Sequence, residues 1–291
     1  MQNDIAKRFI ILLIILFIAA GTSIAGGYDG AKYACFSVFF LCFIWAFILN
    51  WLAFIPASFM QTEKFYDLVG GLTFISIIVL AVLLTPELTL RAKLAATMVI
   101  VWAIRLFSFL FIRIMQDGGD KRFDEVKSIP SRFFITWSIQ ALWAVVTSAC
   151  ALAIIVGGND QPIGIVGVVG ISLWLIGLIV EVIADYQKRA FRRNPNNKET
   201  YIKTGLWAWS RHPNYFGELL LWFGIALLAV PVLSGWQWFA LISPVYLFLM
   251  LTKVTGIPLL EQKANKLWGD DSDYQSYVTN TPVLIPTPPK T

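Results

Sequence analysis

The sequence predicts an all-α membrane protein, a polytopic bundle of about eight transmembrane helices. Of its 291 residues, 57% are hydrophobic and 14% are charged, whereas a soluble domain carries about 25% charged residues. The apolar residues gather in runs long enough to cross a bilayer, which takes roughly 17 to 25 residues in a helix. The Lys and Arg residues lie between these runs or at their ends, apart from Arg105, so they form no continuous basic face for nucleic acid.

Eight apolar runs give the predicted spans. They lie near residues 9–26, 33–56, 66–85, 92–115, 133–156, 163–184, 215–231 and 235–252. The first run, within an N-terminal segment 1–30, could instead be a signal peptide, because Lys7 and Arg8 precede it and Ser23-Ile24-Ala25 resembles a cleavage site. Its apolar core is long for a signal peptide, which favours a retained span. Residues 31–291 are then predicted to form a single membrane domain.

The distribution of positive charge predicts the orientation of the spans. With the N-terminus in the cytoplasm, only Lys32, Arg91 and Lys93 fall on the opposite side of the membrane. Cytoplasmic loops of membrane proteins are enriched in Lys and Arg. We therefore expect both termini in the cytoplasm. Arg105 lies inside the fourth span, where an Arg usually faces a polar cavity or a carboxylate; Glu181 and Glu218 are possible partners.

The sequence carries no metal or disulfide signal. Cys35, Cys42 and Cys150 fall in apolar runs without paired spacing. The single histidine excludes the His-rich metal centres of membrane desaturases and hydroxylases. Gly164, Gly167 and Gly170 follow no strand, so they predict close packing of transmembrane helices rather than a dinucleotide-binding loop.

A short polar segment at residues 59–71 separates the second and third spans. It holds Gln61, Glu63 and Tyr66, followed by Gly70 and Gly71, which permit close backbone approach. Desolvation raises the pKa of a carboxyl group, and a neutral carboxylic acid can donate a hydrogen bond to a carbonyl oxygen. The residue types fit a proton-donating site and ordinary interfacial charges equally well. The mixed charges of residues 117–127 predict an ordered cytoplasmic loop. They do not decide whether this loop contacts a ligand.

The interval 185–218 is the longest polar stretch between two apolar runs. It mixes basic residues with Tyr, Phe and Trp, and contains the only histidine, His212. Guanidinium groups bind phosphates bidentately and stack on flat rings. The mixture favours a site for a planar anionic cofactor over a basic loop that only sets topology. We expect a helix continuing to Asn194-Pro195 and a new helix with Pro213 in its first turn. The tail 253–291 is predicted to close over this loop or to rest on the membrane surface.

The same interval resembles a known superfamily. QKRAFRRNP followed by GLWAWSRHPNYFGE is similar to the NADPH-binding region of the membrane sterol reductases and of the steroid 5-alpha-reductase C-terminal family. The tail LLEQKANKLWGDDSDYQSYVTNTPVLIP is similar to the closing segment of that family. With TEKFYD and GGDKRFDEVK, the chain most resembles the bacterial DUF1295 branch over most of residues 55–290. The resemblance implies an integral protein of the bacterial cytoplasmic membrane.

The resemblance also implies a cofactor and the residues that bind it. NADPH would bind on the cytoplasmic side, with the nicotinamide directed into a cavity among the spans. Carried over by motif, its ligands would be Lys188, Arg189, Arg192, Trp207, Arg211, His212, Asn214, Tyr215 and Glu218. We add Arg105 and Tyr201 to this predicted cofactor set.

The implied catalytic residues are Gln61, Glu63 and Tyr66. Steroid 5-alpha-reductases carry an adjacent Gln-Glu pair that binds the enone carbonyl, and the nearest match here, Gln61-Thr62-Glu63, has one residue inserted. Their Tyr on the following span aligns near Trp102, which cannot act as an acid, so Tyr66 is the substitute. This departure weakens the implication of steroid turnover.

Three functions remain open from the sequence. The favoured function is NADPH-dependent reduction of a hydrophobic enone or conjugated double bond, in a steroid-like or lipid substrate. A membrane methyltransferase of the isoprenylcysteine carboxyl methyltransferase type shares the RHP-x-Y-x-G core and binds S-adenosylmethionine. Asn214, Glu218 and the basic helix end fit the reductase better. A transporter or scaffold would be supported by inverted repeats, which the sequence does not show. The substrate and the oligomeric state stay undetermined.

Overall fold

The computed structural model describes residues 2–120, 123–197 and 199–289. Over these residues the chain is all-α apart from one antiparallel hairpin of β1 (Lys32–Tyr33) and β2 (Phe36–Ser37). The predicted fold class is confirmed. The contacts divide the chain into two compact units: unit 1 runs to Gly164 and includes Leu228–Ser243, and unit 2 comprises Ile165–Leu227 and the chain from Pro244 onward. The single domain expected over 31–291 stays a prediction.

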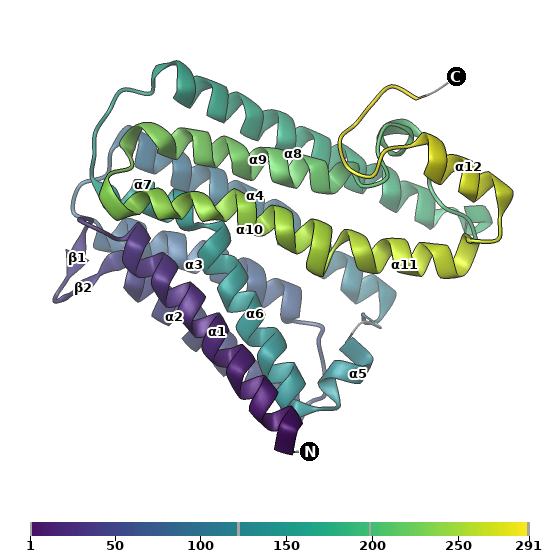
Figure 1. The fold of residues 1–291 in the computed structure, drawn as a ribbon, viewed down its shortest axis with the longest axis horizontal. Helices are drawn as coiled ribbons and strands as arrows, with labels where there is room; N and C mark the ends of the chain where they lie inside the picture. Colours follow the sequence, from purple (N-terminus) through teal and green to yellow (C-terminus); the bar gives the residue numbers. More distant parts are fainter. Residues whose placement is uncertain (1, 121–122, 198, 290–291) are drawn as a thin grey trace. The chain divides into compact units, whose positions relative to one another are not determined.

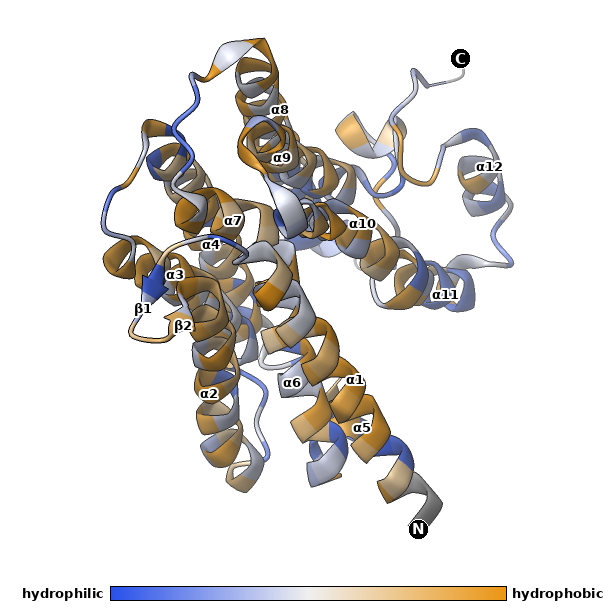
Figure 2. Ribbon diagram, turned by 60° about the vertical axis from the view of Figure 1, so that its left-hand side comes forward, coloured by the Kyte–Doolittle hydropathy of each residue, from blue (hydrophilic) through white to orange (hydrophobic). Residues whose placement is uncertain are grey.

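Unit 1 holds the N-terminal spans, drawn in purple to teal in Figure 1. Its helices are α1 (Gln2–Gly26), α2 (Val38–Phe59), α3 (Tyr66–Leu84), α4 (Leu90–Asp117), α5 (Asp124–Lys127), α6 (Pro130–Thr147) and α7 (Ala149–Gly157). Two short 3₁₀ helices, η4 (Val230–Val232) and η5 (Gly235–Leu241), complete it. Apolar residues cover much of α1 and α2 in Figure 2, as expected for helices that face lipid.

Unit 2 contains the two predicted spans around the polar interval and the C-terminal tail. Its elements are α8 (Gly164–Arg193), η2 (Pro195–Asn197), η3 (Gly205–Ala208), α9 (Pro213–Ala229), α10 (Ile242–Leu249), the π-helix η6 (Met250–Val254), α11 (Ile257–Trp268) and α12 (Ser272–Asn280). The polar residues of α11 and α12 are drawn in blue in Figure 2. Helix α8 ends just before Asn194-Pro195 and α9 begins at Pro213, so both predicted boundaries are confirmed.

The predicted number of spans agrees with the structure. Among the described residues, seven helices are long and apolar enough to cross a membrane, and the bent pair of α6 and α7 brings the number to eight. The second span begins at Val38 rather than at residue 33, because the preceding residues pair in the β1–β2 hairpin. The fifth span bends by 52° at Ser148, between α6 and α7. Every residue of Ala149–Val156 in α7 is buried.

Arg91, at the start of α4, forms hydrogen bonds to other segments of unit 1. Its side chain is 1% exposed. The guanidinium donates hydrogen bonds to the backbone oxygens of Leu228 at 2.7 Å and Pro162 at 2.6 Å. The helix start itself is capped by Thr89, whose hydroxyl accepts from the Ala92 backbone N–H. Arg91 therefore holds the segment before α8 and the last turn of α9 to the start of α4.

Helices α8 and α9 of unit 2 approach each other through glycines. A Cβ atom added at Gly217 would lie 2.6 Å from the Gly177 carbonyl oxygen, and one added at Gly177 would lie 2.5 Å from the Gly217 carbonyl oxygen. A Cβ atom at Gly224 would lie 2.4 Å from the Gly170 carbonyl oxygen. Small residues let transmembrane backbones pack at this range. The packing role predicted for Gly170 is confirmed.

Candidate functional site

The polar interval of unit 2 is fastened to the end of α8. The Gln187 side-chain oxygen accepts a hydrogen bond from the Leu206 backbone N–H at 2.9 Å, and the Trp207 indole donates to the Ala184 carbonyl at 3.1 Å. Gly205 has φ +62°, and a Cβ atom there would lie 2.6 Å from the Gln187 amide nitrogen. Only glycine satisfies both conditions easily. The turn at Thr204-Gly205 is therefore held in one position against the helix.

Arg211 and His212 share the carboxylate of Glu261. The Arg211 Nη1 lies 2.5 Å from Glu261 Oε2, and the His212 Nε2 lies 2.7 Å from Glu261 Oε1. Helix α11 thus contributes the anion that orients the residues preceding α9. The Tyr215 ring stacks on the imidazole with centroids 5.7 Å apart and planes 12° apart. Glu261 is a site residue that the sequence predicted only as part of a closing tail.

Lys188 adds a second cation to this site. Its ammonium lies 4.4 Å from the centroid of the buried Trp207 ring, a favourable cation–π distance. The positive charges of Lys188 and Arg211 both act on His212. The site therefore gathers Arg211 and His212 around one carboxylate, with the Lys188 ammonium over the Trp207 ring and close enough to His212 to affect its charge.

Burial sets the protonation state of His212. Burial lowers the pKa of the imidazole below its usual value and outweighs the effect of its hydrogen bond to Glu261, while Lys188 and Arg211 lower the pKa further. The neutral ring donates from Nε2 to the carboxylate, so Nδ1 carries a lone pair. Within the described part of the chain, neither the buried His212 Nδ1 nor the buried Arg211 Nε has a hydrogen-bond partner. These two atoms suit a ligand that offers one donor and one acceptor.

The stability of the protein is expected to fall between pH 8 and pH 5 partly because of His212. The unfolded imidazole, with a pKa of about 6.5, binds a proton at a pH where the folded imidazole does not. The contribution of the neutral His212 to the free energy of unfolding is therefore present above pH 6.5 and is lost as the pH decreases towards the pKa of the folded imidazole. We expect His212→Gln to reduce this pH dependence of the melting temperature. Since His212 is the only histidine, NMR titration of its ring would report the pKa directly, and a value above 6.5 contradicts the expectation.

The C-terminal tail contacts the interval through aromatic rings and backbone hydrogen bonds. Tyr201 packs against Trp268, Tyr274 and Tyr277 with centroid distances of 5.5, 4.9 and 5.4 Å. The Tyr277 hydroxyl donates to the Trp207 carbonyl at 2.7 Å. Burial raises the pKa of Tyr277, so this hydroxyl keeps its proton. Tyr201 therefore belongs to an aromatic cluster that holds the tail.

The other predicted cofactor residues have different surroundings. Asn214 donates to the Asp185 carboxylate at 3.3 Å. Glu218 lies one turn into α9 and is buried. Arg189 is partly exposed and Arg192 is exposed in the last turns of α8, where positive charge favours the helix dipole. The remaining cofactor residue of the sequence prediction, Arg105, belongs to unit 1, where its guanidinium lies 5.8 Å from the Phe109 ring centroid.

The predicted catalytic residues lie in unit 1, and Glu63 is a paired anion there. Its side chain is 3% exposed. One carboxylate oxygen lies 2.9 Å from the Lys127 ammonium, and the other accepts from the Asp120 backbone N–H at 2.9 Å. Burial raises the pKa of this carboxyl, but the hydrogen bonds from Lys127 and Asp120 lower it below the usual value. The sequence left two roles open for Glu63, and its pairing with Lys127 favours an interfacial charge over a neutral acid. Its catalytic role stays a prediction.

Tyr66 and Gln61 have partners of their own. The Tyr66 hydroxyl donates to the Thr136 carbonyl at 3.0 Å, and its ring packs against Phe123 and Trp137. Gln61 is exposed with φ +49°, and its amide donates to the Ser58 carbonyl at 2.7 Å. The three predicted catalytic residues therefore share one connection between helices but face different partners.

Comparison with known proteins places these units in a family context. The model of a family described as "Protein of unknown function (DUF1295)" matches residues 53–281. An uncharacterized protein of Schizosaccharomyces pombe is 25% identical over 144 residues, 42% of each chain. The 3-oxo-5-alpha-steroid 4-dehydrogenase 1 of Rattus norvegicus is 26% identical over 117 residues, 40% of each chain. A probable O-methyltransferase of Ustilaginoidea virens is 30% identical over 66 residues, 23% of each chain.

These similarities are partial. The matched segment spans less than half the length of each of these curated relatives. No solved structure matches the chain significantly. Two activities are represented among the relatives, a steroid 4-dehydrogenase and an O-methyltransferase.

Proposed function

We propose that this chain, which belongs to the DUF1295 family, is a membrane reductase that uses NADPH to reduce a conjugated double bond in a hydrophobic substrate. The observation that carries the proposal is the site around His212 in unit 2. It combines a lysine over an indole ring, an arginine and a neutral imidazole, and two of its buried nitrogens lack partners among the described residues. The partial similarity to the steroid 4-dehydrogenase of Rattus norvegicus supports the same class.

The donors and acceptors of this site suit the polar groups of a nicotinamide dinucleotide. The Nδ1 of His212 would accept from a ribose hydroxyl or an amide, and the Arg211 Nε would donate to a phosphate or carbonyl oxygen. Lys188, Arg189 and Arg192 would neutralise phosphate groups. S-adenosylmethionine has no phosphate, so the basic end of α8 favours NADPH. Integration into the cytoplasmic membrane, with this site on the cytoplasmic side, is part of the proposal.

The reaction class requires one hydride and one proton. A cofactor held by Lys188, Arg211 and His212 would supply the hydride for the β-carbon of an α,β-unsaturated carbonyl, and a proton would be needed at the α-carbon. Glu63 is anionic in unit 1, so its part would be to hold Lys127 and the loop 117–127 in place. The donor role assigned to Tyr66 from the sequence would require its hydroxyl to leave the Thr136 carbonyl and to donate to a substrate carbonyl, which a phenol can polarise by hydrogen bonding.

Binding measurements on the purified protein in detergent test this function. We expect saturable binding of NADPH in calorimetric titration, weakened about tenfold by Lys188→Met, since a charge-assisted contact contributes roughly 1.5 kcal/mol. Lys203→Met is the matched control, because Lys203 is exposed and lies over another ring, that of Tyr201, at 5.7 Å. Arg192→Ala should also weaken the binding of NADPH more than the binding of NADH.

The same titration distinguishes the second activity. The partial similarity to an O-methyltransferase makes S-adenosylmethionine the competing ligand. Saturable binding of S-adenosylmethionine without binding of NADPH would overturn the reductase and assign the site to methyl transfer.

A further inference from the structure

A polar hollow of about 480 Å³ lies in unit 1 where three connections meet. The connection after α1 contributes Asp29, the connection between α3 and α4 contributes Glu87, and the segment after α7 contributes Asp160. All three side chains are exposed. Asp160 interacts electrostatically with the buried guanidinium of Arg91, whereas Asp29 and Glu87 form no salt bridge with another described residue. The electrostatic attraction of this hollow is therefore for a cation.

Thr85 adds an independent sign of a ligand. Its side chain is 7% exposed and lines the hollow. Its hydroxyl oxygen is buried and has no hydrogen-bond partner among the described residues. A buried hydroxyl without a partner is costly, and an N–H donor would satisfy its lone pairs. Among the described residues, no group of three acidic side chains could hold a metal ion. An ammonium on a flexible headgroup can instead pair with carboxylates that lie further apart.

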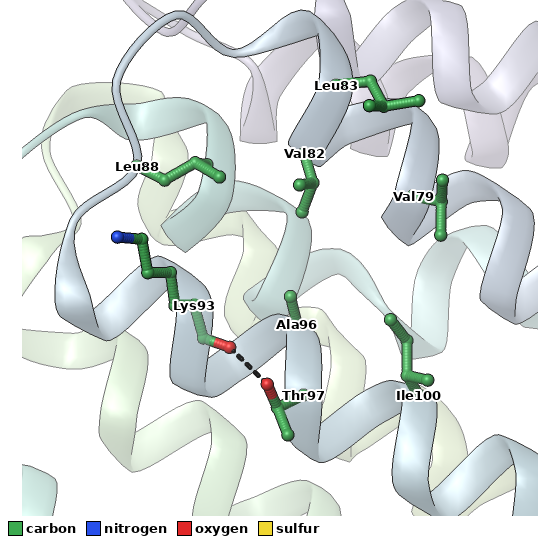
Figure 3. A pocket seen from close by; sticks show the side chains of 8 residues that line it. All are labelled: Val79, Val82, Leu83, Leu88, Lys93, Ala96, Thr97 and Ile100. Atoms are coloured by element: carbon green, nitrogen blue, oxygen red, sulfur yellow. Dashed lines mark hydrogen bonds between the residues drawn. The ribbon is translucent and has the colours of Figure 1, made fainter.

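An apolar groove of about 250 Å³ begins beside the hollow (Figure 3). Val79 and Leu83 of α3 form one wall, and their side chains are 40% and 75% exposed. Ala96 and Ile100 of α4 form the other wall. Leu88 lines both the groove and the hollow, so the two lie side by side at this residue.

Lys93 stands at the end of the groove nearest the hollow. Figure 3 shows its side chain extending towards the connection that carries Leu88, with the hydroxyl of Thr97 hydrogen-bonded to its backbone oxygen. The order along the surface is thus an acidic hollow, one lysine and an apolar groove. This order matches a phospholipid with an amine headgroup, which carries an ammonium, then a phosphate, then an acyl chain.

We propose that the hollow and the groove together bind one phospholipid of the phosphatidylethanolamine type. The ammonium would lie among the three carboxylates and donate to the Thr85 hydroxyl. Lys93 would pair with the phosphate, as basic side chains at membrane interfaces do. One acyl chain would fill the groove between α3 and α4, where lining residues are apolar and open to the lipid.

Native mass spectrometry of the full chain tests this site. The detergent-solubilised protein is incubated with an equimolar mixture of dioleoyl phosphatidylethanolamine, phosphatidylcholine and phosphatidylglycerol. We expect phosphatidylethanolamine to be retained about fivefold more than either other lipid. The double variant Asp29→Asn, Glu87→Gln should remove this preference, since an exposed charge pair changes affinity about 2- to 5-fold. Glu125→Gln, an exposed carboxylate on α5, is the matched control.

A second variant tests the groove separately. Leu83→Trp changes an exposed position and should lower retention of the lipid while the melting temperature stays within a few degrees of the unchanged protein. Equal retention of the three lipids would overturn the proposal. So would competition by glycerophosphoethanolamine, which has no acyl chains, at the same concentration as the lipid, because the groove would then contribute nothing. Preference that survives the double variant would equally overturn it.

Discussion

Replacing Gly217 with alanine is expected to destabilise unit 2 by about 2–3 kcal/mol, the usual range for inserting a methyl group into packed structure. The new Cβ atom would lie 2.6 Å from the Gly177 carbonyl oxygen and 2.7 Å from the Glu181 backbone nitrogen. Both contacts are with backbone atoms of α8, which can move away only if the helices separate. We expect the melting temperature in detergent to fall by about 5–10 °C.

Gly21→Ala is the matched control for this substitution. Gly21 lies in α1, and nothing lies within 4 Å of a Cβ atom built there. The same chemical change should leave the melting temperature unchanged or raise it, because alanine favours the helix over glycine by about 1 kcal/mol. Equal melting temperatures for the Gly217 variant and the unchanged protein would mean that α8 and α9 do not approach as closely as the structure shows.

Glu63→Gln is expected to release the loop 117–127 and to cost about 2–3 kcal/mol of unfolding free energy, because two hydrogen bonds to a charged group are lost or weakened. The glutamine keeps the size of the side chain but not its charge. Since the pKa of Glu63 is lowered in the folded protein, this stabilisation is present above pH 4.3 and is lost as pH falls through the folded pKa. Hydrogen exchange of the loop amides, together with the melting temperature, measures the effect.

Asp124→Asn is the control for this substitution, because it removes an exposed carboxylate that pairs with the same lysine, Lys127. Asp124 also lies 2.9 Å from the Lys127 ammonium, but its side chain is 59% exposed. Exposed pairs of this kind contribute about 0.2–1 kcal/mol, so the loop should stay protected from exchange. If both variants release the loop to the same extent, the buried position of Glu63 has no special role in ordering it.

The spans could be predicted from the sequence because a membrane-crossing segment must be about twenty apolar residues long. Such a segment must also be helical, since its backbone hydrogen bonds have to be formed within the segment. The bend at Ser148 could not be predicted, since it lies within a continuous apolar run. The hairpin before α2 was missed for a related reason: Tyr33, Cys35 and Phe36 extend the apolar pattern although the backbone there forms strands. The composition of a segment indicates whether it is apolar enough to enter the membrane, but it does not show where the backbone bends or turns.

The candidate site divides along similar lines. Arg211, His212 and Tyr215 are adjacent in one motif, so the sequence brought them together. Their carboxylate partner Glu261 lies about fifty residues further along, on a helix whose placement depends on tertiary contacts. Lys127, the partner of Glu63, is hidden in the same way, so the residue types alone fitted a proton donor and an interfacial charge equally well. Charges that pair across long sequence separations are the part that residue patterns do not reveal.

The complete burial of α7 limits how its sequence can vary. A helix that meets lipid on one side tolerates larger or smaller apolar residues at every third or fourth position, as in α1, where Phe9 and Phe17 are 60% and 80% exposed. From Ala149 to Val156 the helix has no face that tolerates such changes in size, since each residue is buried. Any chain that keeps this bend must therefore match the volume of eight successive side chains, and hydropathy alone would accept many replacements there that the packing would reject.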